Sequence, residues 1–405
     1  TSHLGLSYAR FVSNTATSSG GGLGLGLQLN GSVVQADHSE FTRNRAGTAG
    51  GGVFLGSTLY AAGTVWNDSR FEENSAALGG ALHSGFVGYD SSFALRRGEL
   101  NANSAASDAG AVYFGLTLYG SEAQVEDNLF ASNSTGGRGG AFCANLFAAF
   151  GGAVTFTNNV LISNTAVISG GGFYADIMAY EGSAATFDDN RLENNRAGGD
   201  GGGALLGRST TGYQGSHVEV NRNAVVGNTA TGNGAGLYLH DLVDGSELQF
   251  HDNVIQGNVI SSATSYHGGG VYIYAVDEGS TLGMTGNQLN DNAATGSGGG
   301  LYVEEDIDNG SVWTFEDNEL QRNWAGEDGG GAYIDDGFND GTTVYFRRNL
   351  LNDNVATNEC GGLYIDTVER NQTEFAGNQL NRNTSGRDHG ALYVGALDRG
   401  TSMRF

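Results

Sequence analysis

Proline and lysine are absent from this 405-residue chain, and cysteine occurs only twice. Proline cannot donate an amide hydrogen bond to a neighbouring strand, so its absence suits a chain built from inner strands. Two cysteines cannot form a disulfide framework, so the cysteine count does not indicate whether the chain belongs in an oxidising or a reducing compartment.

Positive charge is scarce as well. All 19 basic residues are arginines and 44 residues are acidic, which gives a net charge of −25. Phosphate binding depends on clustered Lys and Arg, so we expect no nucleic-acid partner. No run of about 20 apolar residues is present, and we expect no membrane span in this segment.

Glycine, by contrast, is abundant, with 69 residues. It does not fall at every third position, which excludes collagen, and 39% of the residues are hydrophobic, which argues against a flexible low-complexity chain. The glycines gather in clusters 29 to 34 residues apart, as in 20–22, 50–52 and 298–300. A short unit therefore repeats throughout the chain.

A second phrase keeps step with the glycine clusters: an apolar residue followed three residues later by asparagine. It supplies one asparagine per unit, at Asn14, Asn44, Asn74, Asn103, Asn133, Asn164, Asn195, Asn228, Asn258, Asn292, Asn323, Asn354 and Asn383. From residue 128 onward another asparagine precedes it by five, at Asn128, Asn159, Asn190, Asn223, Asn253, Asn287, Asn318, Asn349 and Asn378.

The residues after each glycine cluster alternate with a period of two, as in Leu301-Tyr302-Val303. This period predicts strands, and no stretch keeps the helical spacing long enough to form a helix. A unit of about 30 residues with two or three short strands has the size of one coil of a parallel β-solenoid. We therefore expect an all-β fold of about 13 coils that runs as a single continuous solenoid over residues 1–405, with longer loops near 204–217 and 260–267.

The asparagines fit this fold as structural ladders. Identical positions of successive coils stack about 4.8 Å apart, so each side-chain amide can bond to those above and below it. Asparagine also tolerates the left-handed backbone that a corner needs. We expect Asn318, Asn323, Asn349 and Asn354 to belong to two such ladders, and the alternative is that they face solvent and bind a ligand.

The phrases Gly79-Gly80-Ala81-Leu82 and Phe41-x-x-Asn44 together resemble the repeats of polymorphic membrane proteins and related bacterial right-handed β-helix surface proteins. This resemblance implies a right-handed parallel β-helix. It also implies an extracellular or cell-surface location and a role as an adhesin or autotransporter passenger.

One strand position carries a column of tyrosines opposite the aliphatic core. Its members in the last six coils are Tyr238, Tyr272, Tyr302, Tyr333, Tyr364 and Tyr393. We interpret the column as a docking strip for a neighbouring rod, another surface protein or a glycan. The alternative is an aromatic stack that stabilises the sheet and is covered by its own loops.

Acidic loops follow the tyrosine strand, and stacking brings them to one side. Calcium prefers oxygen ligands of this kind. The candidate calcium ligands are Asp306, Asp308, Asp335, Asp336 and Asp340. The alternative is a solvated acidic face, and we expect no cofactor to be required.

Many β-helix proteins are polysaccharide lyases or glycoside hydrolases, which need convergent acid and base groups. Carboxylate pairs occur here, but 44 acidic residues make them expected. We therefore predict no catalytic residues and a structural or adhesive role as a stalk, adhesin passenger or filament, with a carbohydrate-active β-helix enzyme as the alternative.

The repeat phrase continues to both ends of the sequence without a polar cap, and Phe405 repeats the position of Phe375. An uncapped end coil exposes strand edges. We expect this chain to be either a segment of a longer repeat protein or a subunit of a fibre.

Overall fold

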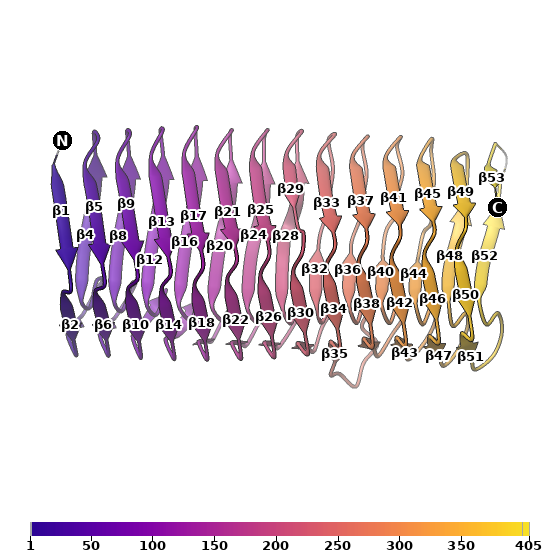
Figure 1. Cartoon of the computed structure of the whole chain (residues 1–405), viewed down its shortest axis with the longest axis horizontal. Helices are drawn as coiled ribbons and strands as arrows, with labels where there is room; N and C mark the ends of the chain where they lie inside the picture. The colour runs from indigo at the N-terminus through magenta and orange to yellow at the C-terminus, as the bar shows by residue number, and fades with distance from the viewer. Residues whose placement is uncertain (1, 399, 405) are drawn as a thin grey trace. The chain divides into compact units, whose positions relative to one another are not determined.

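In the computed structural model, which describes residues 2–398 and 400–404, a typical repeat folds into a coil of four short strands (Figure 1). The chain divides into unit 1, Thr1–Gly198, and unit 2, Gly199–Phe405. Within each unit, strands at the same place in successive coils pair in parallel and form four sheets, which we call A to D in the order in which a coil passes through them. No helix occurs among the described residues.

In unit 1, each sheet takes its strands from successive coils. Sheet A contains β1 (His3–Ser7), β5 (Val33–Asp37), β9 (Gly63–Asn67), β13 (Ser92–Arg96), β17 (Glu122–Glu126), β21 (Ala153–Thr157) and β25 (Ala184–Asp188). Sheet B contains β2 (Arg10–Val12), β6 (Glu40–Thr42), β10 (Arg70–Glu72), β14 (Glu99–Asn101), β18 (Leu129–Ala131), β22 (Val160–Ile162) and β26 (Arg191–Glu193). Sheet C contains β3 (Thr15–Ala16), β7 (Arg45–Ala46), β11 (Ser75–Leu78), β15 (Ser104–Asp108), β19 (Ser134–Thr135), β23 (Thr165–Ala166) and β27 (Arg196–Ala197). Sheet D contains β4 (Leu23–Leu29), β8 (Val53–Leu59), β12 (Leu82–Gly88), β16 (Val112–Leu118), β20 (Phe142–Ala149) and β24 (Phe173–Tyr180).

Unit 2 repeats the same arrangement. Sheet A contains β29 (His217–Glu219), β33 (Glu247–His251), β37 (Thr281–Thr285), β41 (Val312–Glu316), β45 (Thr343–Arg347), β49 (Gln372–Ala376) and β53 (Ser402–Arg404). Sheet B contains β30 (Ala224–Val226), β34 (Val254–Gln256), β38 (Gln288–Asn290), β42 (Glu319–Gln321), β46 (Leu350–Asn352) and β50 (Gln379–Asn381). Sheet C contains β31 (Thr229–Ala230), β35 (Val259–Ile260), β39 (Ala293–Ala294), β43 (Trp324–Ala325), β47 (Val355–Ala356) and β51 (Thr384–Ser385). Sheet D contains β28 (Ala204–Tyr213), β32 (Leu237–Leu239), β36 (Val271–Ile273), β40 (Leu301–Val303), β44 (Ala332–Ile334), β48 (Leu363–Val368) and β52 (Leu392–Leu397).

The core of each unit is made of like residues stacked on like. In unit 1, Phe41 of β6 pairs with Phe71 of β10, and their ring centroids lie 5.0 Å apart. In unit 2, the rings of Phe315 and Phe346 lie 4.8 Å apart and are also buried. These separations equal the spacing of paired strands, so each coil presents the next with a matching apolar surface.

Asparagine side chains form hydrogen-bonded columns inside both units. In unit 2, Nδ2 of Asn318 donates to the carbonyl of Met284 at 2.9 Å and to Oδ1 of Asn349 at 3.2 Å. Asn323 makes the corresponding bond to Oδ1 of Asn354 at 3.0 Å. These four asparagines are no more than 1% exposed, and the same kind of bond joins the ladder asparagines of unit 1.

The corner of the backbone is made by the residue before each of these asparagines. Asp317 and Arg322 both have φ of 54°, in the left-handed region, whereas Asn318 and Asn323 do not have a positive φ. The expectation that asparagine occupies the left-handed corner is therefore wrong. Its amide is what the position requires, because Oδ1 of Asn323 also accepts the backbone N–H of Asn292 at 3.0 Å.

The prediction of an all-β parallel solenoid of about 13 coils with about 30 residues each is confirmed. A coil holds four strands, however, where the alternation indicated two or three. The strands of sheet C are as short as two residues, as in β7 and β43, and two residues cannot display a period.

The two repeats that are longer than the others differ from each other. Residues 204–217 were expected to form a loop, but residues 204–213 of this segment form the whole of β28. Within β28 the hydroxyl of Thr211 donates to the carbonyl of Leu206 at 2.7 Å and joins the two halves of the strand. Residues 261–270, by contrast, contain no strand and form the connection from β35 to β36 (Figure 1). Phe405 lies outside the described residues.

Candidate functional site

The tyrosine column of unit 2 lies on the outer side of sheet D, as its alternation with buried aliphatic residues requires. The rings stack along the sheet, with centroid distances of 4.6 Å between Tyr238 and Tyr272 and 5.4 Å between Tyr302 and Tyr333. Tyr364 and Tyr393 continue the column at 4.5 and 4.6 Å. All six predicted tyrosines therefore come together in one stack.

Much of this column is covered. Tyr238, Tyr272 and Tyr302 are between 2% and 5% exposed, whereas Tyr333, Tyr364 and Tyr393 are half-buried. Residues of the loops of unit 2 cover these rings. The ring of His267 stacks on that of Tyr302 at 4.5 Å, and Glu304 accepts a hydrogen bond from the hydroxyl of Tyr272. Asp335 accepts hydrogen bonds from the hydroxyls of Tyr302, at 2.7 Å, and Tyr333, at 3.2 Å.

Burial also raises the pKa of the phenols of Tyr272 and Tyr302, and their hydrogen bonds to Glu304 and Asp335 raise it further. These hydroxyls therefore remain protonated and donate to the carboxylates. In the first three coils of the column, the exposed surface that a docking strip would use is small, and a binding role for the six tyrosines stays a prediction.

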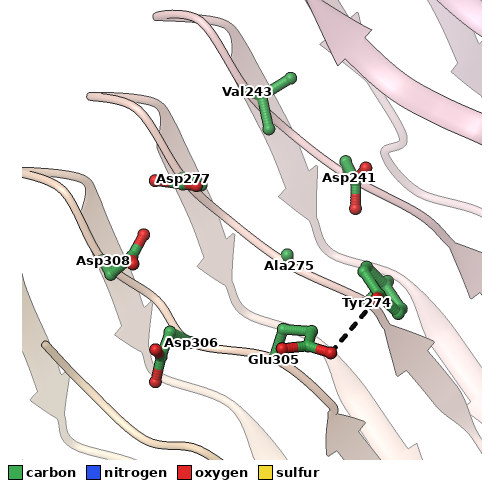
Figure 2. Close-up of a pocket in the computed structure, with 8 residues that line it drawn as sticks. All are labelled: Asp241, Val243, Tyr274, Ala275, Asp277, Glu305, Asp306 and Asp308. Carbon is green, nitrogen blue, oxygen red and sulfur yellow. Dashed lines mark hydrogen bonds between the residues drawn. The ribbon is translucent and has the colours of Figure 1, made fainter.

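A groove opens beside the covered column, at the ends of β32, β36 and β40. It has a volume of about 310 Å³, and Figure 2 shows its lining residues, which are Asp241, Val243, Tyr274, Ala275, Asp277, Glu305, Asp306 and Asp308. The hydroxyl of Tyr274 donates to Glu305 at 3.1 Å.

The loops that line the groove are held in register by buried apolar residues. Leu242, Val276 and Ile307 are no more than 1% exposed and pair with one another as parallel bridges in successive coils. The residues on either side of each anchor point the other way, because side chains alternate in extended backbone. Asp306 and Asp308 flank Ile307 in this manner, so the acidic side chains face the groove.

Two carboxyl groups of the groove titrate differently. Burial, and then a hydrogen bond with Asp277, raise the pKa of Asp308 to about 7. Burial acts in the same direction on Asp277, but hydrogen bonds with Asp308 and with Nδ2 of Asn309, at 2.8 Å, bring the pKa of Asp277 below its usual value. The pair thus contains one carboxyl that holds a proton near neutral pH and one that has lost it.

The five aspartates predicted as calcium ligands do not gather in one place. Asp306 and Asp308 line the groove, whereas Asp335 accepts the tyrosine hydroxyls. Asp340 pairs with Arg370 at 2.5 Å, and Asp336 is exposed with its pKa raised to about 6, by partial burial first and by neighbouring acids such as Asp306 next. Within the described ranges, no group of three or more His, Cys, Asp or Glu side chains is arranged to hold a metal ion.

Tyr274 and the pairing of Asp277 with Asp308 were missed at the level of sequence. Tyr274 lies two residues after Tyr272, so the period of two that identifies the tyrosine column places it on the same side of the strand. Asp277 and Asp308 directly follow the paired anchors Val276 and Ile307, so the repeat places them in adjacent coils, but the spacing does not show that their carboxyl groups share a hydrogen bond.

Comparison with known proteins adds a match in the middle of the chain. Residues 98–241 match a family model described as right handed beta helix region. This match covers about a third of the chain and, together with the parallel coils, shows a right-handed parallel β-helix repeat protein. It does not distinguish the polymorphic membrane protein type from other repeats of this fold.

No curated protein matches the chain. Among the residues that the structure describes, there is no helix long and apolar enough to cross a membrane.

Proposed function

We propose that this chain is a structural and adhesive β-helix repeat protein of the cell surface or extracellular space, acting as a stalk, an adhesin passenger or a filament component. The observation that carries the proposal is the use of buried polar side chains. In successive coils the side-chain amides of the ladder asparagines form hydrogen bonds with neighbouring coils, as the amide of Asn318 does with Met284 and Asn349. Such repetition adds stability coil by coil and serves length and stiffness.

We infer that the repeats are of the polymorphic membrane protein type, and the glycine clusters and the Phe-x-x-Asn phrases support this inference. Self-association, or contact with other surface proteins or glycans, is the partner class that follows. The exposed parts of Tyr333, Tyr364 and Tyr393 are the section of the column that such a partner could reach.

The test is direct imaging of the purified chain together with an assay for turnover of acidic polysaccharides. We expect stiff, protease-resistant particles that assemble along or beside one another and leave the polysaccharides intact. Isolated short particles that cleave an acidic polysaccharide would contradict the proposed role.

A second candidate, a carbohydrate-active enzyme, is favoured by one observation. Glycoside hydrolysis needs one protonated and one ionised carboxyl group. Asp308 and Asp277 have pKa values displaced in opposite directions within a groove of about 310 Å³, but their shared hydrogen bond holds the two carboxyl groups closer than the separation of about 5 Å or more that such enzymes use. This groove is at the small end of the range for ligand sites. In this case Asp308→Asn would abolish turnover, and Asn309→Ala, which removes only the amide donor to Asp277, would reduce it less.

A further inference from the structure

Unit 1 carries a surface without charged residues on the outside of sheet D. It comprises β4, β8, β12, β16 and β20 with the turn residues that follow them, which are residues 23–31, 53–60, 82–89, 112–120 and 142–152. Asp90, the next residue of the turn after β12, is exposed at the edge of this surface. These segments contain no Asp, Glu, Lys or Arg, although 16% of the whole chain is charged and about seven charges would be expected among them. We call this surface the uncharged face.

The strands of the uncharged face lie side by side in Figure 1 and pair in register. One outward row runs from Phe86 to Leu116 and on to Leu146, and these side chains are half-buried. The row begins at Leu27, which is 60% exposed, and Ser57 lies between Leu27 and Phe86. Apolar side chains therefore face solvent over several successive coils.

The turns beside this row add a column of exposed aromatic residues. Tyr60, Tyr89, Tyr119 and Phe150 are between 36% and 51% exposed. Their rings stack with centroid distances of 5.0 Å from Tyr60 to Tyr89, 5.0 Å from Tyr89 to Tyr119 and 5.4 Å from Tyr119 to Phe150. The column edges the uncharged face along four consecutive coils.

The turn itself does not call for aromatic residues. All four have φ between 50° and 58°, a left-handed conformation that is costly for bulky side chains. The corresponding left-handed turn position in other coils holds polar residues, as at Asn30, Asp244, Glu278, Asn309 and Asp340. Four exposed aromatic residues in a strained position indicate a contact made outside the chain.

A second copy of this chain is the occupant that the charge distribution favours. Each copy has a net charge of −25, so two copies repel wherever their acidic surfaces meet. The uncharged face is the surface on which they can approach with Asp90, at its edge, as the single acid of these strands and turns. A sugar is less well suited, because the stacked rings cover one another's faces and present mainly edges and hydroxyl groups.

The size of the uncharged face also suits a pair of copies. Five strands at about 4.8 Å spacing and about eight residues at 3.3 Å each give a footprint of roughly 600 Å² per copy. Both copies together would bury roughly 1,200 Å², which passes the ~1,000 Å² expected of a biological interface. A two-fold pair presents the same face from both partners, so one surface is sufficient.

We propose that the uncharged face of unit 1 is a self-association surface on which a second copy of this chain packs, sheet against sheet. The proposal deepens the structural function proposed above and rests on it only for its biological purpose. The pairing itself can be measured without reference to location or adhesion.

The experiment measures the mass of the full chain by sedimentation equilibrium over a range of concentrations. The wild type is expected to dimerise, and the double variant Tyr89→Glu, Leu116→Glu is expected to raise the Kd about a hundredfold or more, because it sets carboxylates against each other in the interface. Gln214→Glu is the matched control, since it places a carboxylate at the corresponding exposed turn position of unit 2. It should leave the Kd unchanged.

A second double variant, Tyr89→Asn with Tyr119→Asn, guards against misfolding of the first. Asparagine already occupies this turn position at Asn30 and Asn309, so the fold is expected to persist, and the Kd should still rise at least about tenfold. Circular dichroism verifies that both variants are folded.

Three results would overturn the proposal. The first is a wild type that stays monomeric at every concentration, whether or not it binds a glycan probe. The second is that the variants of the uncharged face dimerise like the wild type. The third is that the Gln214→Glu variant dissociates as readily as the variants of the uncharged face. A dimer that depends on the uncharged face and also cleaves polysaccharide would keep this proposal and overturn the proposed structural function.

Discussion

Asn323 and Asn354 are separated by one coil of chain, yet Nδ2 of the first donates to Oδ1 of the second at 3.0 Å inside the core of unit 2. Nδ2 of Asn323 also donates to the carbonyl of Leu289 at 2.7 Å, and its Oδ1 accepts from the backbone and the side chain of Asn292. One side chain thus joins three coils, and both donors and the acceptor of its amide are used.

We predict that Asn323→Ala lowers the free energy of unfolding by about 3 kcal/mol, because it leaves buried donors and acceptors on two neighbouring coils without partners. Urea unfolding followed by circular dichroism measures the change. The control is Gln256→Ala, which removes an exposed amide whose bond to Asp291 is at the surface of unit 2. It should cost less than about 1 kcal/mol. Equal costs for the two variants would contradict a structural role for the ladder.

We predict that each covered tyrosine stabilises the fold through its stacked ring and, to a smaller extent, through the hydrogen bond of its hydroxyl. Tyr302→Phe keeps the ring and loses the bond to Asp335, and we expect it to lower the free energy of unfolding by about 1 kcal/mol. Tyr302→Ala also removes a buried ring and should cost about 3 to 5 kcal/mol. Thermal unfolding measures both, and Tyr345→Phe, on half-exposed surface of β45, is the control for the loss of a hydroxyl. An alanine variant as stable as the phenylalanine variant would show that stacking contributes nothing.

The pH dependence of stability follows from the groove. The folded-state pKa of Asp308, about 7, is above its ordinary value of 3.8, so the folded state binds a proton more tightly than the unfolded state. The resulting stabilisation is complete below pH 3.8 and is lost as the pH rises through 7. We expect the Tm to be about 2 °C higher near pH 5 than near pH 8.

Asp308→Asn should remove much of this slope, and Glu122→Gln, at an exposed position of β17, should not. Ion-paired acids act in the opposite direction at lower pH. Arg322 lowers the pKa of Asp291, so the contribution of Asp291 is lost as the pH falls through its folded-state value. A Tm that increases steadily from pH 5 to pH 8 would contradict the assignment of a proton to Asp308.

Removal of divalent metal should leave the Tm unchanged. The aspartates predicted as calcium ligands already have other partners: Asp335 accepts hydroxyl groups of the tyrosine column, and Asp340 pairs with Arg370. Differential scanning calorimetry with a chelator, and then with added calcium, measures this. A fall in Tm that calcium alone reverses would make the acidic loops a calcium site and contradict the prediction that no cofactor is required.

Much of the fold could be predicted because its signals are local and repeated. The period of two in Leu301-Tyr302-Val303 assigns a strand, and the recurrence of asparagine at intervals near 30 residues assigns a column. Both signals are visible within one or two coils. The two-residue strands of sheet C escaped prediction, since β43 contains only Trp324 and Ala325 and shows no pattern.

The candidate site was predicted less completely. The acidic loops could be recognised by composition, but the contact of Asp277 with Asp308 and the cover over Tyr272 depend on side-chain directions in adjacent coils. Residues 204–217 illustrate the same limit. Their extra length predicted a loop, whereas bonds such as that from Thr211 to Leu206 support a long strand there.

The sequence by itself determined the coil length, the inward and outward sides of each strand and the positions of the ladders, because these depend on spacing along the chain. Only the tertiary structure decided which outward columns are covered and which stay open. Stacking brings residues about 30 apart in sequence to within about 5 Å of one another. The covered tyrosines of unit 2 lie in the strands of sheet D beneath neighbouring loops, whereas the open aromatic column of unit 1, from Tyr60 to Phe150, lies in the turns, and spacing along the chain does not show that the first is buried and the second exposed.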